Sequence, residues 1–142
     1  MSREALARLR RYWETLTREQ VVAVGAVYAD DAYFRDPFSD VRGVEAIARI
    51  FDHMYESLDD PRFRITETIL EGDSAVLIWD FEFRVKKWQP DVTQVIHGLS
   101  HVRFGPDGRV TYHRDYWDAA GELYAKLPVV GPLMRYLARK MG

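Results

Sequence analysis

The sequence predicts an α+β fold, in which helices at the start of the chain pack on one face of a mostly antiparallel sheet. Apolar residues recur every three or four positions in the first part of the chain, which is typical of amphipathic helices. Later they alternate with polar residues, which is typical of half-buried strands. Helices that precede a run of strands favour the α+β class. A chain of 142 residues with 47% hydrophobic residues also fits one globular domain, residues 1–142.

Three helices are predicted before the main run of strands. The first spans residues 3–16, where one face carries Leu6, Leu9, Trp13 and Leu16. Thr17 then offers an N-cap for the second helix, and Gln20 three residues later completes a capping box. The third helix spans residues 47–58 and is ended by the "DDP" of residues 59–61. Its apolar face consists of Ile47, Ile50, Phe51, Met54 and Leu58.

Strands are predicted around and after the third helix. A brief aromatic strand at residues 32–36 is stopped by Pro37. The turn segments "EGDS", "KKWQPD" and "GPDG" separate the later strands, expected at residues 63–70, 75–83, 92–104 and 109–117. Alternation puts one set of side chains of residues 75–83 on the buried face: Ala75, Leu77, Trp79, Phe81 and Phe83. Residues 119–142 are expected to add a C-terminal helical extension, interrupted by Pro128, Gly131 and Pro132.

Charge and composition exclude several classes of function. A net charge of −2 and a sequence pI near 6.1 give no excess of Lys and Arg for nucleic acid. The chain has no cysteine, which excludes disulfides, thiol nucleophiles and thiolate metal sites. Its first residues are charged and lack the apolar segment of a secretory signal, and no apolar run reaches the roughly 18 residues of a spanning helix. We therefore expect a cytoplasmic protein without membrane contact.

The histidines do not predict a metal site. His97 and His101 lie on one predicted strand and point the same way, but strand rise separates them by about 13 Å, so they cannot share one ion. Nucleotide fingerprints, phosphate-binding glycine loops and serine nucleophile motifs are absent from the sequence. No metal and no cofactor is expected.

Three segments together point to a known superfamily. "ADDAYFRDP", the following "GVEAIARIF" and the late "FGPDGRVTYHRDYWD" resemble the nuclear transport factor 2-like superfamily, and more narrowly its ketosteroid isomerase and SnoaL-like polyketide cyclase branches. The resemblance covers residues 3–118. It implies a cone-shaped sheet that wraps the three helices and leaves an apolar cavity open at one end. It also implies a homodimer paired through the outer sheet face, with Val76, Ile78, Ile96 and Val102 as contributors.

The resemblance assigns the first pair of catalytic candidates. Asp36 falls on the general base of the isomerase, and Tyr12 precedes it at the separation that the isomerase keeps between its oxyanion-hole tyrosine and its base. A carboxylate in an apolar pocket has a raised pKa and can take a proton from a carbon next to a carbonyl. A tyrosine hydroxyl can stabilise the resulting enolate by a hydrogen bond. The isomerase's second oxyanion donor, an Asp, corresponds here to Ser100, which is a weaker donor.

A second pair of catalytic candidates lies in "YHRDYWD". His113, Asp115 and Trp117 share one face of the last strand by its period of two, whereas Arg114 lies on the other face. The hairpin pairing places the first face on the same side as Ser100. His113 and Asp115 are therefore predicted to form an acid/base pair near the cavity mouth. The substrate-binding residues are predicted to be Ser100 and an inner aromatic set, Trp79, Phe81, Phe83 and Trp117.

Each candidate also has a structural explanation that the sequence leaves open. The Asp36 carboxylate can cap the turn beside Pro37. Tyr12 can place its ring in the core and its hydroxyl on a backbone carbonyl. His113 and Asp115 can simply hold the last strand in place. The inner aromatic set can be plain core.

The sequence therefore predicts a protein that binds a small lipophilic carbonyl compound, steroid-like or polyketide-like. We expect it to act as a cofactor-independent isomerase or cyclase by proton transfer at carbon. One alternative is a binding or dimerising module that keeps the cavity without chemistry. Another is an enzyme similar to limonene epoxide hydrolase that uses Asp36, Arg114 and Asp115, although strand alternation separates Arg114 from Asp115.

Overall fold

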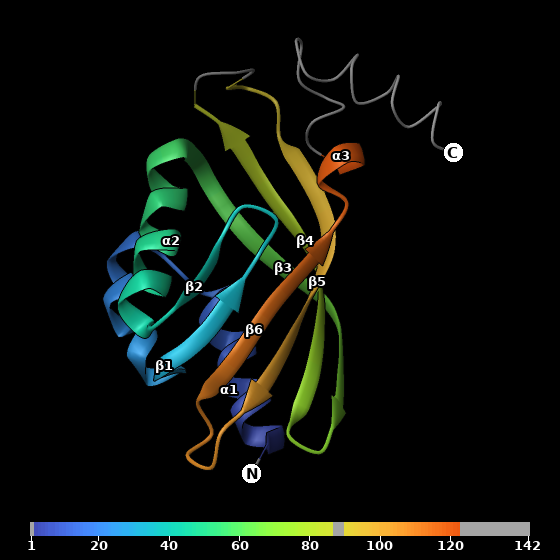
Figure 1. Ribbon diagram of the computed structural model, residues 1–142. Helices are drawn as coiled ribbons and strands as arrows, with labels where there is room; N and C mark the ends of the chain where they lie inside the picture. Colours follow the sequence, from blue (N-terminus) through green and yellow to red (C-terminus); the bar gives the residue numbers. More distant parts are fainter. Residues whose placement is uncertain (1, 87–89, 123–142) are drawn as a thin grey trace.

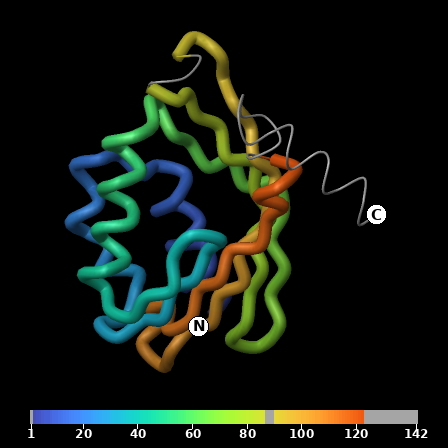
Figure 2. The backbone as a smooth tube through the Cα atoms, turned by 45° about the horizontal axis from the view of Figure 1, so that its top comes forward, coloured from blue at the N-terminus to red at the C-terminus, as the bar shows by residue number. Residues whose placement is uncertain are grey.

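The computed structural model describes residues 2–86 and 90–122 of the chain. It confirms an α+β fold in which helices pack on one face of a curved sheet (Figure 1). Figure 2 shows this sheet curving around the helices at the start of the chain. The predicted helical extension lies mostly outside the described residues, which contain only its first turn, α3 (Ala119–Glu122). No helix in the described part of the chain is long and apolar enough to span a bilayer.

The N-terminal helices follow the apolar pattern with one exception. α1 (Ser2–Glu14) buries Leu6, Leu9 and Trp13, as predicted. α2 (Val44–Ser57) buries Ile47 and Phe51. The second predicted helix is instead a 3₁₀-helix, η1 (Arg18–Ala26), and its N-cap Thr17 makes no side-chain capping bond. The capping-box prediction was wrong here because "REQVVAVGA" is rich in valine and contains glycine, both weak α-helix formers.

The sheet contains β1 (Tyr28–Arg35), β2 (Asp40–Arg42), β3 (Leu58–Glu71), β4 (Ser74–Val85), β5 (Gln94–Phe104) and β6 (Val110–Trp117). Their spatial order is β2-β1-β6-β5-β4-β3. The last four strands in the sequence form the predicted antiparallel meander, whereas β1 runs parallel to β6. Residues 59–61 were predicted to end the third helix, but they lie within β3. The helix already ends at Ser57, and the backbone is extended from Leu58 onward.

Alternation along β4 is confirmed, since Ala75, Leu77, Trp79 and Phe83 are buried on the helix-facing side. The prediction that Ile96 and Val102 lie on the outer face was wrong. Val102 pairs with Ala75 and Ile96 pairs with Phe81, so both face inward, with exposed fractions of 0% and 5%. The period of one strand does not fix its register with the next, and that register decided the face. Val76 and Ile78 do lie on the outer face, half-buried.

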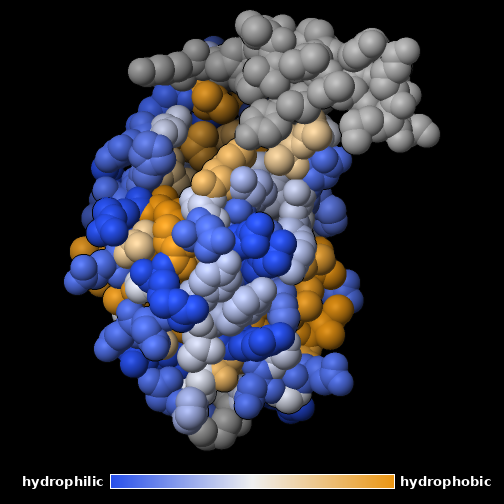
Figure 3. Space-filling view, viewed as in Figure 1, coloured by the Kyte–Doolittle hydropathy of each residue, from blue (hydrophilic) through white to orange (hydrophobic). Residues whose placement is uncertain are grey.

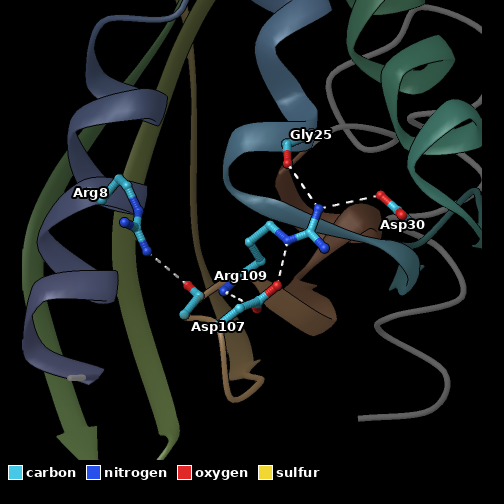
Figure 4. A network of polar contacts seen from close by, with 6 residues as sticks. Arg8, Gly25, Asp30, Asp107 and Arg109 are labelled. Atoms are coloured by element: carbon cyan, nitrogen blue, oxygen red, sulfur yellow. Dashed lines mark hydrogen bonds and ion pairs between the residues drawn. The ribbon is translucent and has the colours of Figure 1, made fainter.

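The "GPDG" hairpin joins β5 to β6 and is tied to the rest of the fold by two arginines (Figure 4). Gly108 adopts a positive φ of 81°, which glycine tolerates. Arg109 donates to the Asp107 carboxylate at 2.8 Å. It also reaches Asp30 and the carbonyl of Gly25, each at 3.3 Å, while Arg8 reaches the carbonyl of Gly108. These contacts fix the start of β6 beside the start of β1.

Candidate active site

The parallel pairing of β1 and β6 brings two carboxylates to one end of the sheet. Arg35 pairs with Arg114, so the residues that follow them, Asp36 and Asp115, become neighbours. Both line an open pocket of about 570 Å³, together with Trp117. The other lining residues are Arg35, Pro37, Arg114, Tyr116 and Asp118. Parallel strands end at the same edge of a sheet, which explains why residues so distant in sequence meet here.

Asp36 both caps a turn and faces this pocket. Its backbone N–H donates to the carbonyl of Ser39 at 3.0 Å, and its Oδ1 accepts the N–H of Phe38 at 2.8 Å. Burial raises the pKa of the carboxyl above its ordinary value. The hydrogen bond from Phe38 opposes that rise, and the nearby charge of Asp115 adds to it. The capping role and the raised pKa therefore occur together in one residue.

Asp115 accepts two hydrogen bonds on a single oxygen. His113 Nε2 lies 2.6 Å from Asp115 Oδ1, and Ser100 Oγ lies 2.5 Å from the same atom. The His113 side chain is 4% exposed and that of Asp115 is 18% exposed, so the pair extends from the core to the pocket wall. The register that pairs Ser100 with Asp115 places the hydroxyl there.

Two indoles complete this hydrogen-bonded chain on either side. Trp79 Nε1 donates to Ser100 Oγ at 2.9 Å. On the other side, the hydroxyl of Tyr28 lies 2.8 Å from His113 Nδ1, and Trp13 Nε1 donates to that hydroxyl at 3.3 Å. This series of hydrogen bonds thus links side chains from α1, β1, β6, β5 and β4 in the buried interior.

Tyr12 adopts the structural arrangement that the sequence left open. Its hydroxyl donates to the backbone carbonyl of Gln20 at 2.9 Å. Burial, with a smaller contribution from Tyr55, raises the pKa of Tyr12 to about 12, so the phenol keeps its proton. That proton points at the backbone in this structure and not at the pocket carboxylates.

Sequence reasoning missed Tyr28 and Tyr55. Tyr28 is fully buried, and its pKa lies well above the ordinary value, chiefly because of burial. It is the first residue of β1, whose burial pattern becomes regular only at Ala32 and Phe34, so periodicity gave no signal for it. The hydroxyl of Tyr55 is buried and has no hydrogen-bond partner among residues 2–86 and 90–122. No sequence pattern distinguishes Tyr55 from an ordinary core tyrosine on α2.

The inner aromatic set packs around one glycine and a further phenylalanine. Phe63 stacks on Phe81 with ring centroids 4.5 Å apart, and Phe81 contacts Phe83 at 5.0 Å. A side chain at Gly98 would place its Cβ 2.7 Å from the Trp79 ring and 2.8 Å from Trp117 Cβ, so glycine allows the two indoles to approach. Trp79 and Phe83 are core residues, whereas Phe81 and Trp117 are partly exposed.

His97 and His101 each contact a different polar side chain. His97 Nδ1 lies 2.8 Å from Asp80, and His101 Nε2 lies 2.6 Å from Ser74. Across the described ranges, no three His, Asp or Glu side chains gather in a way that could hold an ion.

Arg114 lines the open pocket, but its guanidinium lies over the ring of Tyr116, 4.8 Å from the centroid, on the outer side of β6.

Comparisons with known proteins agree on the fold. Residues 9–113 match the family model of the SnoaL-like domain. A steroid Δ-isomerase from Nocardioides simplex is 27% identical over 125 residues, which cover 87% of this chain and 96% of that protein.

Solved structures with low sequence identity share the architecture. A protein with a ketosteroid isomerase-like fold from Catenulispora acidiphila, solved in complex with trimethylamine, superposes with a TM-score of 0.71 at 16% identity, covering 84% of this chain and 89% of that one. An epoxide hydrolase from M. tuberculosis, similar to limonene epoxide hydrolase, gives a TM-score of 0.70 at 19% identity, covering 97% and 96%.

Proposed function

Since the chain belongs to the SnoaL-like family, we propose that it binds a small lipophilic carbonyl compound and transfers a proton at a carbon next to the carbonyl, without a cofactor. The observation that carries this proposal is the meeting of Asp36 and Asp115 at one pocket, in unequal environments. Neighbouring carboxylates in unequal environments can take different roles in one reaction. The similarity to a steroid Δ-isomerase supports a steroid-like substrate, and the family supports a polyketide-like one.

Asp36 is the proposed base. A raised pKa brings a carboxylate closer to the pH at which it works and makes it a better proton acceptor from carbon. The carboxylate removes a proton from the carbon, the electron pair moves onto the carbonyl oxygen, and the protonated Asp36 returns the proton at a second carbon of the enolate. No proton or electron is lost in this cycle, as an isomerisation requires.

The enolate oxygen needs a hydrogen-bond donor in an apolar surrounding. Tyr12 was predicted for this role, but it is bound to the carbonyl of Gln20. The buried hydroxyl of Tyr55 has an unused proton among the described residues and lies close enough to affect the pKa of Tyr12. Tyr55 is therefore our proposed donor, with Tyr12 as its neighbour, and it lies outside the set of residues that line the open pocket. The ring of Trp117, which lines the pocket, supplies apolar surface for the substrate.

The test follows isomerisation of a Δ5-3-ketosteroid through the ultraviolet absorbance of the conjugated enone. Replacing Asp36 with Asn should lower kcat by about 100-fold or more, because loss of a general base typically costs that much. The matched control is Asp31→Asn, an exposed carboxylate of the same strand that does not line the pocket. Undiminished turnover by Asp36→Asn would remove Asp36 as the base.

A binding measurement separates the enzyme from a module without chemistry. An equilenin-like phenolic steroid mimics the dienolate and should perturb the NMR signals of Trp117 and of the Asp36 carboxyl. Binding without turnover by the wild-type protein would favour the binding module. The absence of both binding and turnover would contradict a lipophilic carbonyl ligand.

Epoxide hydrolysis is the second candidate, because Asp36, Arg114 and Asp115 all line the pocket. The position of the Arg114 guanidinium over Tyr116 argues against a joint action with Asp115. Turnover of a limonene-type epoxide that is lost in Arg114→Gln would favour this candidate over isomerisation.

A further inference from the structure

The buried hydrogen-bonded chain has a definite direction, and it begins at an indole. An indole N–H can only donate, so the hydroxyl oxygen of Tyr28 accepts the hydrogen bond from Trp13. The hydroxyl proton then needs an acceptor of its own. The neighbour that offers one is His113 Nδ1, 2.8 Å away.

The opposite direction would leave two buried groups unsatisfied. If His113 Nδ1 carried the proton and donated to Tyr28, the phenol proton would have no acceptor within the described part of the chain. The lone pair of Nε2 would also face Asp115 Oδ1 at 2.6 Å. A buried polar group without a partner is costly, so this arrangement is disfavoured. The phenol keeps its proton, because burial raises the pKa of Tyr28.

The second half of the hydrogen-bonded series, from Trp79 through Ser100, ends on the same carboxylate. Trp79 can only donate, so Ser100 accepts from it and donates its own proton to Asp115 Oδ1. Both donor paths thus end on Oδ1. Within residues 2–86 and 90–122, no donor reaches Oδ2, the other oxygen of a side chain that lines the pocket.

The imidazole of His113 is held in place by three rings. The ring of Phe34 lies 4.5 Å from it, that of Trp13 5.2 Å, and that of Tyr28 5.8 Å in a stacked arrangement. A ring packed this closely keeps one orientation, so its two nitrogens keep their separate partners.

We infer that Tyr28 is a positioning residue that, together with Asp115, holds His113 with its proton on Nε2, and thereby presents Asp115 Oδ2 to the pocket as a second proton acceptor beside Asp36. Tyr28 itself touches no substrate. This role rests on the proposed function, because Asp115 serves the proton transfer only if the pocket performs it. Asp115 Oδ2 would then take from Asp36 the proton removed from the first carbon and return it at the second carbon, so the cycle still neither gains nor loses a proton.

The first test needs no substrate. The ¹⁵N chemical shifts of His113 in the wild-type protein report which nitrogen carries the proton, and we expect Nε2 protonated and Nδ1 as acceptor. Tyr28→Phe should remove the hydrogen bond to Nδ1 and shift the Nδ1 resonance toward that of an unbonded nitrogen, while the contact with Asp115 keeps the proton on Nε2. The matched control is Tyr112→Phe, which removes a phenol from the residue adjacent to His113 on the outer face of β6. This control should leave the shifts unchanged.

A proton on Nδ1 in the wild-type protein would overturn the inference, whether or not Tyr28→Phe folds. Unchanged His113 shifts in folded Tyr28→Phe would also overturn it.

In the isomerisation assay, Tyr28→Phe should lower kcat about tenfold with little change in KM, the effect of losing one buried hydrogen bond. The predicted tautomer together with no turnover in any variant would refute the proposed function and leave the fixed tautomer standing.

Discussion

At the scale of single residues, the fold destabilises the ionised form of one pocket residue, Asp36. Burial and the charge of Asp115 both disfavour the ionised form of Asp36. The folded protein nevertheless keeps the carboxylate at the pocket, where a raised pKa is useful for proton transfer. The ionised side chain therefore lowers the stability of the fold, a cost that the proposed role of Asp36 as a base would explain.

This cost predicts how stability depends on pH. Because the pKa of Asp36 is higher in the folded state than in the unfolded state, folding takes up a proton between these two values. The cost of the ionised side chain is absent below the unfolded pKa and fully present above the folded pKa. Asp36→Asn removes that cost, and its Oδ1 can still accept the N–H of Phe38.

We therefore expect Asp36→Asn to be more stable than the wild-type protein at neutral pH, with the difference shrinking as the pH falls through the raised pKa. Urea unfolding across this pH range measures it, with the exposed Asp31→Asn as control. A variant that is less stable at neutral pH would mean that the carboxylate's turn contacts outweigh its burial.

At the scale of elements, the parallel pair β1 and β6 forms the site, and the hairpin before β6 secures that pair. Val110 N–H donates to the carbonyl of Val27 at 2.8 Å, directly beside the contacts of Arg109 with Asp107 and Gly25. Parallel pairing joins segments that are distant in sequence, so it needs such anchors more than a hairpin does.

Replacing Arg109 with Gln should loosen this junction. We expect faster hydrogen exchange at the amide of Val110, because the side chain that ties the hairpin to Gly25 and Asp30 is lost. Arg103→Gln is the control, since this exposed guanidinium lies over Tyr112 on the outer face. Equal exchange at Val110 in both variants would show that the backbone pairing needs no arginine.

At the scale of the whole molecule, the outer face of the sheet is partly apolar. Ile78 pairs with Leu99 across β4 and β5, and Leu99 pairs with Tyr116 of β6. Ile69 is 51% exposed and Tyr116 is 44% exposed. Figure 3 shows hydrophobic residues gathered at the right of the view, over the side of the sheet that carries β3 and β4. A homodimer paired through this face stays a prediction, now without Ile96 and Val102, which face the core.

We expect the protein to be a dimer in light scattering after size-exclusion chromatography. Ile78→Lys should convert it to a monomer, because a charge at the centre of an apolar interface is costly to bury. Val22→Lys is the matched control, since Val22 on η1 is 89% exposed and lies away from the sheet. A wild-type monomer, or a dimer that tolerates Ile78→Lys, would place the association elsewhere or rule it out.

The sequence by itself determined the class of fold and placed several of the candidate residues. Local periodicity is a property of a single helix or strand, so it correctly placed α1 and α2 and the inner face of β4. The same period placed His113 and Asp115 side by side on β6. The resemblance of "DDAYFRDP" selected Asp36, whose raised pKa depends on burial that no local pattern displays.

Only the tertiary structure decided which strands meet and in what register. Ile96 and Val102 face the core because β5 pairs with β4 in a register that their own alternation does not contain. Tyr28 reaches His113, and Asp36 reaches the neighbourhood of Asp115, because β1 lies parallel to β6 across a long stretch of chain. Periodicity reveals which residues share a face, whereas the packing free energy of the whole core selects the partner of each face.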